Sequence, residues 1–272
     1  SLSQDLLKTY FGAEDTGPPA EFDAKLYQTD GGGIALFPYA DDDLTLTARV
    51  ASVAAGRFSG ARLAQYFRKV LDDPKETRER SIIALFGLAT TGAPVMPSID
   101  QFARASDLTV REHLYLGLAA LAAGNDDVAR EQYRQVILRY AERRDPSVRI
   151  LVGVDQDDIL EATSLAADLA AGLGDASAPA LFAYTNENRT TDLLVELDRV
   201  SYLARALPRL PSAPVRFSYM LDGQRKEATL DAGRSLALSL TPPELAALDP
   251  QRLDGDVGIA TFFETPFDPA SV

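Results

Sequence analysis

Hydrophobic positions from Leu44 to Leu207 recur at the spacing of amphipathic helices, and glycine or proline interrupts them at short intervals. Such a succession predicts consecutive helical hairpins joined by short turns. Between the long helices, 147–154 is predicted to be a short extended piece. The chain is therefore predicted to be mainly α, with helices over 44–55, 60–71, 76–91, 97–105, 109–123, 126–143, 158–172, 176–184 and 190–207.

Three prolines between Leu207 and Val215 end the helical pattern, because proline lacks the backbone donor and biases the preceding residue toward extended geometry. Beyond them, apolar and polar residues alternate, which is typical of strands. The sequence predicts a helical domain over 1–210 and a small antiparallel β domain, a sandwich-like fragment, over 211–272. The β domain is predicted to have strands at 215–221, 236–240 and 257–263, an Asp-Gly turn at 222–223, and a helical turn over 242–248.

The amino-acid composition excludes several kinds of catalytic and metal-binding site. The chain of 272 residues has no cysteine and a single histidine, His113. Disulfides, thiol nucleophiles, thiolate zinc sites and two-imidazole sites are therefore excluded, and no cofactor is expected. The formal net charge of -13 disfavours nucleic acid as a partner. The apolar runs fall short of the roughly 20 residues that cross a bilayer, so no membrane insertion is expected.

The most distinctive stretch is a glycine-rich turn, Asp30 to Gly33, followed by Tyr39 and the aspartates Asp41, Asp42 and Asp43 just before a helix. Adjacent carboxylates beside an aromatic ring can bind a cation or a sugar. The simpler interpretation is that Asp42 or Asp43 caps the helix, where a carboxylate also interacts well with the helix dipole.

A second acidic string, Asp155, Gln156, Asp157 and Asp158, precedes the alanine-rich helix. Clustered carboxylates raise one another's pKa, so that one of them can act as a general acid. The simpler interpretation is capping of that helix, with loose Ca²⁺ affinity. The spacing does not fit an EF-hand, because Ala166 stands where the bidentate glutamate belongs.

A family resemblance starts at the glycine-rich turn. Gln28-Thr29-Asp30-Gly31-Gly32, then an aromatic residue and proline, then an aspartate before a helix that opens with Thr47-Ala48, resembles the repeat of α/α toroids. That superfamily includes the thioester domains of alpha-2-macroglobulins, protein prenyltransferases and terpene cyclases. The segments 161–166 and 186–197 resemble the inner helices and turns of the macroglobulin type. The resemblance covers roughly 24–207 and implies an α/α toroid.

The chain differs from the members of that superfamily at the residues that carry their chemistry. Macroglobulin thioesters need a Gly-Cys-x-Glu-Gln motif, and the nearest string here, Gly12 to Asp15, has neither reactive residue. The zinc site of prenyltransferases needs a cysteine. Asp155 to Asp158 matches the Asp-x-Asp-Asp string of terpene cyclases, but the chain has no tryptophan and only 8% aromatic residues to line a carbocation cavity.

A tetratricopeptide-like α solenoid is the alternative fold, suggested by 114–129 with Tyr133 and Tyr140, although no second copy of that pattern occurs. A solenoid would leave an open groove, whereas a toroid closes into a ring.

The functional hypothesis from the sequence is a non-catalytic structural or interaction module of a bacterial secreted or cell-surface protein, with a protein or a cell-surface glycan as its partner. The binding candidates are Tyr39, Asp41, Asp42, Asp43, Asp155, Asp157 and Asp158. The rival hypothesis is an α/α-toroid enzyme, either terpene cyclase-like or polysaccharide-degrading. An enzyme needs these aspartates to converge in a deep pocket.

Overall fold

The computed structural model describes residues 2–11, 23–209, 214–221, 223–231 and 236–254. The chain divides into two compact units: Ser1–Leu6 with Thr16–Arg209, and Leu7–Asp15 with Leu210–Val272. The first is called the helical unit and the second the β unit. The helical domain predicted over 1–210 differs from this division at Leu7–Asp15, because contacts between distant segments leave no mark on a hydrophobic pattern.

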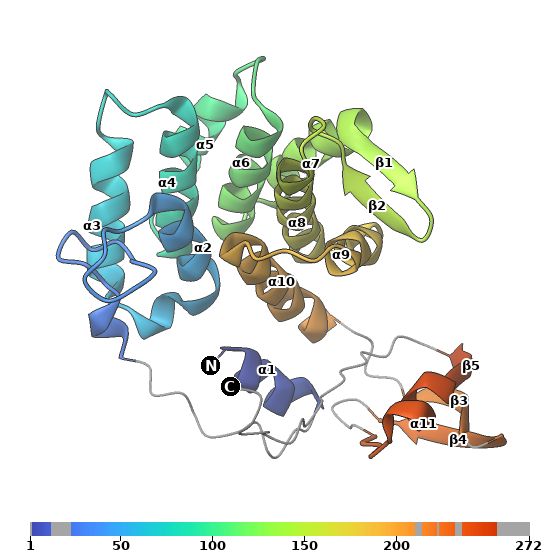
Figure 1. Cartoon of the computed structure of the whole chain (residues 1–272). Helices are drawn as coiled ribbons and strands as arrows, with labels where there is room; N and C mark the ends of the chain where they lie inside the picture. The colour runs from blue at the N-terminus through green and yellow to red at the C-terminus, as the bar shows by residue number, and fades with distance from the viewer. Residues whose placement is uncertain (1, 12–22, 210–213, 222, 232–235, 255–272) are drawn as a thin grey trace. The chain divides into compact units, whose positions relative to one another are not determined.

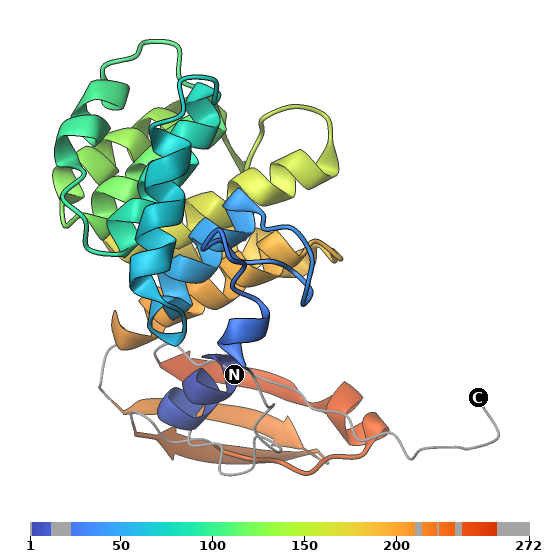
Figure 2. The same ribbon diagram turned by 90° about the vertical axis from the view of Figure 1, so that its left-hand side faces the viewer.

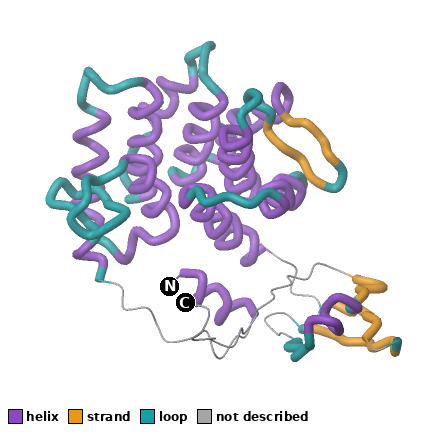
Figure 3. Tube along the Cα trace, in the orientation of Figure 1, coloured by secondary structure: helices purple, strands orange, loops and turns teal. Residues whose placement is uncertain are grey.

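The predicted mainly α fold is confirmed, and Figure 3 shows helices dominating the described part of the helical unit. Helix α1 (Leu2–Phe11) is divided between the two units, since Leu6 belongs to the helical unit and Leu7 to the β unit. The other α-helices of the helical unit are α2 (Leu44–Ala54), α3 (Gly60–Leu71), α4 (Arg78–Thr90), α5 (Met96–Ala103), α6 (Val110–Ala122), α7 (Asp126–Tyr140), α8 (Gln156–Leu173), α9 (Ala178–Glu187) and α10 (Leu193–Ala206). Short 3-10 turns are η1 (Ala24–Leu26), η2 (Ala55–Arg57) and η3 (Leu207–Arg209).

Five alternate helices form a closed inner ring (Figure 1). α2 packs against α4, α4 against α6, α6 against α8, α8 against α10, and α10 returns to α2. The helices α3, α5, α7 and α9 flank this ring on the outside. An open solenoid would not bring its first and last helices together, so the contact between α10 and α2 excludes the solenoid alternative.

Small residues let the ring helices approach closely. α8 is buried over almost its whole length, and Gly117 of α6 faces Leu169 so tightly that a Cβ there would lie 2.6 Å from a leucine methyl. Overpacked cores are destabilised, so glycine is needed at this contact. The alanine-rich pattern that predicted a tightly packed inner helix therefore corresponds to a real crowding of α6 and α8.

One predicted helix is shorter than expected. Residues 141–144 leave α7 and form β1 (Ala141–Arg144), which pairs antiparallel with β2 (Ser147–Ile150). The prediction of helix over 126–143 was wrong at this end. Pairing across the turn satisfies the backbone of 141–144, and the hairpin packs β2 against α8 and α9.

The β unit contains a three-stranded antiparallel sheet in the order β4, β3, β5, drawn orange to red in Figure 2. Its elements are β3 (Val215–Leu221), β4 (Gln224–Leu230), α11 (Pro242–Ala247) and β5 (Asp249–Asp254). The strand predicted at 236–240 is absent, and the strand predicted at 257–263 lies outside the described residues.

The partner strand was misjudged because β4 is polar and largely exposed, and therefore lacks an apolar alternation. Gly223, with φ of 71°, lets the chain reverse at once, so the nearest segment pairs with β3 whatever its polarity. β5 takes the other edge of β3, which leaves no edge of that strand for 236–240.

Candidate functional site

A layer of polar side chains crosses the middle of the inner ring. Four of them occupy the same position, five residues after the first residue of their helices: Arg49 of α2, Tyr115 of α6, Glu161 of α8 and Asp198 of α10. We call these four residues the ring layer. Arg49 and Asp198 are 2% and 3% exposed, so the layer lies in the interior of the helical unit.

Arg49 binds the other three members of the ring layer at once. Its Nε donates to Tyr115 Oη at 2.9 Å, Nη1 to Asp198 Oδ2 at 2.9 Å, and Nη2 to Glu161 Oε1 at 2.5 Å. The guanidinium also lies 5.7 Å from the centre of the Tyr115 ring. Because Asp198 belongs to the last inner helix and Arg49 to the first, this ion pair joins the two ends of the ring.

Further charges surround the ring layer and are themselves paired. Arg111 Nη1 donates to Glu161 Oε2 at 2.7 Å, and its Nε lies 3.1 Å from Glu79 Oε1. Ser164 donates its hydroxyl to Asp198 at 2.5 Å. Deeper in the ring, Arg205 of α10 pairs with Asp168 of α8 at 2.8 Å.

Burial and pairing shift the pKa values in opposite directions. Burial alone would lower the pKa of Arg49, but the attraction of Asp198, Tyr115 and Glu161 outweighs it and raises that pKa further above its ordinary value. Burial raises the pKa of Asp198 to about 7, against the opposing attraction of Arg49. Burial likewise raises the pKa of Tyr115 to about 12. The guanidinium is therefore charged at every physiological pH, and the Tyr115 hydroxyl keeps its proton.

The ring layer is poorly suited to catalysis. Its carboxylates accept hydrogen bonds from guanidinium or hydroxyl groups of the layer and its neighbours, and its most buried members are out of reach of a substrate. Removing one partner of such a pair leaves a buried charge uncompensated, which is strongly destabilising. The ring layer holds four of the five inner helices, α2, α6, α8 and α10, in one register.

The first predicted cluster serves local structure. Asp43 caps α2 by accepting a hydrogen bond from the Leu46 amide at 2.7 Å. Asp42 accepts the Thr29 hydroxyl at 2.7 Å and also bonds Tyr66, whose pKa is raised by burial first and then by this carboxylate. Asp41 points to solvent, and Tyr39 is 98% exposed. Capping by Asp43 agrees with the simpler interpretation of this cluster.

The second predicted cluster also begins with a cap. Asp155 Oδ1 accepts hydrogen bonds from the amides of Asp157 and Asp158 at 2.8 and 3.3 Å. All three aspartates are exposed. Asp157 lines an open hollow of about 550 Å³ together with the segment 189–192, which leads into α10.

The glycine-rich motif builds the turn ahead of α2. The buried Gln28 side chain donates to Gly32 O at 3.0 Å and accepts the Ser59 amide at 3.0 Å. A Cβ on Gly33 would lie 2.6 Å from Asp42 and 2.8 Å from the Tyr66 ring, so this position admits no side chain. Thr47 of α2 accepts the Ile34 amide at 2.8 Å and fixes the turn to the ring. The motif on which the resemblance rests is therefore architectural.

His113 lies half-buried on α6, where its Nδ1 is 2.7 Å from Gln132 Oε1 of α7. Within the described ranges, no three His, Asp or Glu side chains are placed to hold a metal ion. No helix in the described part of the chain is both long and apolar enough to cross a membrane.

Sequence reasoning missed the ring layer. A signal for it exists, because Asp198 follows Leu194 by four residues and so falls on the apolar stripe of its helix. Arg49 likewise lies between Ala48 and Val50 and is the one charged residue of its helix. Charged residues on an apolar face predict buried ion pairs, but the pattern does not say which helices will supply the partners.

Comparison with known proteins found a similarity in structure. No protein-family model matches the chain, and no curated protein sequence matches it. Among solved structures, the native conformation of E. coli alpha-2-macroglobulin matches with 18% sequence identity and a TM-score of 0.50 over 76% of this chain. The match covers 14% of that much longer protein. The chain therefore has a macroglobulin-like fold over about three quarters of its length.

Proposed function

We propose that the helical unit is a non-catalytic protein-interaction module of a larger macroglobulin-like protein. The observation that carries the proposal is the ring layer: the interior of the ring holds paired, buried charges where an enzyme of this architecture would need a substrate cavity. The likeness to one part of a long macroglobulin supports a modular context.

The predicted aspartates support the same reading. In the enzyme hypothesis, Asp41 to Asp43 or Asp155 to Asp158 would have to converge around a reacting group. Instead, Asp43 and Asp155 cap two different helices, and Asp41, Asp157 and Asp158 are exposed.

Two finer parts of the hypothesis remain proposals. We place the chain at the surface of a bacterium, or outside it, and the likeness to a macroglobulin supports this location. A protein partner is favoured over a glycan, because the exposed side chains of the helical unit include large apolar ones such as Phe37 and Val154. Glycan sites in contrast depend on convergent polar groups in a concave site.

The first test is turnover. The whole chain is incubated with a panel of isoprenoid diphosphates and bacterial polysaccharides, and products are measured by mass spectrometry. We expect no turnover. Product formation that disappears in Asp157→Asn or Asp42→Asn would overturn the proposal in favour of the enzyme.

The second test asks whether the chain binds protein. Cells that express it naturally are treated with a short amine-reactive crosslinker, and adducts are identified by mass spectrometry. We expect discrete adducts with one or a few proteins, at reproducible lysine positions. Adducts that are equally frequent with the most abundant proteins, in proportion to their abundance, would count against a specific interaction module.

A further inference from the structure

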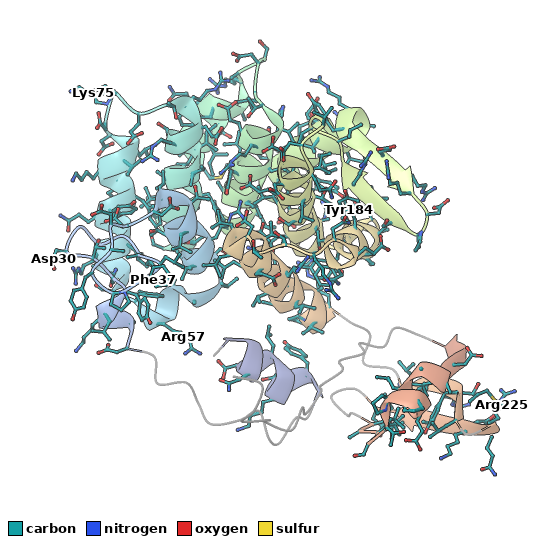
Figure 4. All side chains as sticks on the ribbon, in the orientation of Figure 1. Asp30, Phe37, Arg57, Lys75, Tyr184 and Arg225 are labelled. Carbon is teal, nitrogen blue, oxygen red and sulfur yellow. The ribbon has the colours of Figure 1, made fainter. Side chains whose placement is uncertain are left out.

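The large exposed hydrophobic side chains of the helical unit are unevenly distributed. Within the described residues, all but Leu138 of α7 lie in segments that lead into α2, α8 or α10 or at the start of α10 itself. They are Leu26, Leu36, Phe37 and Tyr39 before α2, Leu151 and Val154 before α8, and Leu193 at the first position of α10. In Figure 4, Phe37 and Asp30 mark the loop ahead of α2.

These segments lie at the same end of the ring, because the inner helices run in parallel. α8 and α10 are joined by Glu161 and Asp198 through Arg49, five residues after each start, and by Asp168 with Arg205, twelve residues after each start. Because each of these two contacts joins residues that are equally far from the starts of α8 and α10, the two helices run in the same direction. Their first residues are therefore neighbours.

The other inner helices share this direction. Arg111 and Glu79, each the second residue of its helix, pair across the starts of α6 and α4. Chiefly Glu76, but also Asp43, raises the pKa of Arg80, so the cap of α2 lies near the start of α4. α2 therefore begins at the same end as the others. We call the residues 36–43, 151–158 and 189–193 the N-terminal face.

The N-terminal face combines apolar side chains with a strong negative charge. The first two segments carry three aspartates each, and in the third Arg189 offsets Asp192, so the net charge is -6. That is nearly half of the charge of the whole chain, -13, in 21 residues. The open hollow of about 550 Å³ beside Asp157 makes part of this surface concave. A complementary surface is basic and apolar.

The backbone conformation at Tyr39 also favours a binding role for this face. Its φ of 68° is a left-handed conformation, which glycine adopts readily and a bulky residue does not. It follows Pro38 in a turn closed by the Ala40 amide and Phe37 O at 3.2 Å. The strained turn presents an aromatic ring that is 98% exposed, and strain of this kind is typical of functional positions.

We propose that the N-terminal face is the docking surface for a protein segment that presents lysine or arginine beside aromatic or aliphatic side chains. This inference rests on the proposed interaction function and specifies its site and partner chemistry. Apolar contacts around Tyr39 and Val154 supply the affinity, and the aspartates select a basic partner and accelerate its approach.

The test uses the whole chain, immobilised, and a random peptide library displayed on phage. We expect the enriched peptides to combine basic with aromatic or aliphatic residues. The affinity of a selected synthetic peptide is then measured by fluorescence anisotropy. We expect at least about a tenfold loss in Phe37→Ser/Tyr39→Ser and in Val154→Ser/Leu193→Ser, and weaker binding as salt rises.

The matched control is Leu138→Ser, which removes an exposed leucine, 69% accessible, from α7. It should leave the peptide affinity unchanged. Circular dichroism and thermal unfolding establish that each variant is folded. Asp157→Asn/Asp158→Asn should lower the affinity and flatten its salt dependence without changing the fold.

Three results would overturn the inference: a library without enrichment of basic sequences, peptides that bind the variants of the face as well as the original chain, or an equal loss in Leu138→Ser. Peptides that bind specifically but ignore the N-terminal face would leave the interaction function standing and remove only its proposed site. Turnover in the enzymatic assay would instead remove the function itself.

Discussion

The ring layer and the N-terminal face reverse the usual distribution of polarity within one helical unit. In the ring layer, charged side chains such as Arg49 and Asp198 are buried, and each is paired. At the N-terminal face, large apolar side chains such as Phe37 and Val154 are exposed. Scattered surface hydrophobics are ordinary, but a gathered and acid-bordered set is not. The first region is explained by the stability of the ring, and the second is the surface where we propose that a partner docks.

The largest expected effect comes from breaking the ring layer. Arg49→Met leaves Asp198 buried without its cation and should destabilise the helical unit by about 3–5 kcal/mol. Urea unfolding measures this loss. In Arg49→Met/Asp198→Leu, both charges are gone, and much of the stability should return. Arg80→Ala, which breaks an exposed pair with Glu76, is the control and should change stability by less than about 1 kcal/mol.

A double variant no more stable than Arg49→Met would show that Asp198 is not the group that Arg49 compensates. The ring layer would then lose its role as the lock between α2 and α10, and the contrast with the N-terminal face would rest on packing alone.

The next effect is a pH dependence. The pKa of Asp198 in the folded chain is about 7, above its ordinary value of 3.8, so folding favours the protonated carboxyl. Its contribution to stability is therefore complete below the unfolded pKa and is lost as pH rises through about 7. Between about pH 4 and 7, the chain should lose stability relative to Asp198→Asn, by at most about 1.4 kcal/mol per pH unit, and the loss should level off above about pH 7.

Urea unfolding of both chains across this range gives the measurement. If the stability of Asp198→Asn changes with pH in parallel with that of the original chain, Asp198 does not titrate in this range. If the original chain gains stability relative to the variant as pH rises, the pKa of Asp198 is lowered by folding and not raised.

Smaller effects separate capping aspartates from surface ones. Asp43→Ala removes the side chain that accepts the Leu46 amide and should cost about 1 kcal/mol, within a range of about 0.5–2. Asp41→Ala, two residues earlier, is the matched control and should leave thermal stability almost unchanged. Equal effects of the two substitutions would deny Asp43 its capping role.

The smallest effect is at Tyr39, where function and stability should oppose each other. Tyr39→Gly relieves the left-handed backbone and should stabilise the chain by up to about 1 kcal/mol, whereas Tyr39→Ala removes the ring but keeps the strain. Both should weaken peptide binding equally. A destabilised Tyr39→Gly, measured by thermal unfolding, would show that the aromatic ring supports the fold instead of a partner.

Features that depend on nearby residues were predicted well from the sequence, and features that depend on distant contacts were not. The helices around Leu63 and Phe86 were predicted to within a few residues, because their apolar spacing and terminal glycines act within one turn or two. The strand 224–230 was missed because an exposed strand needs no apolar alternation. Tyr39 and the two aspartate clusters were singled out from the sequence as binding candidates, but the pattern could not show that their segments share one end of the ring.

By itself, the sequence determined the helical hairpins, the change to β structure after the prolines, and the absence of cysteine chemistry. All of these follow from backbone preferences, hydrophobic periodicity or composition. Only the tertiary structure decided that α10 closes on α2, that Arg49 meets Asp198 from 149 residues away, and that the exposed apolar residues gather on one face. Such contacts depend on which helices become neighbours, and that choice is made by the packing of the whole ring.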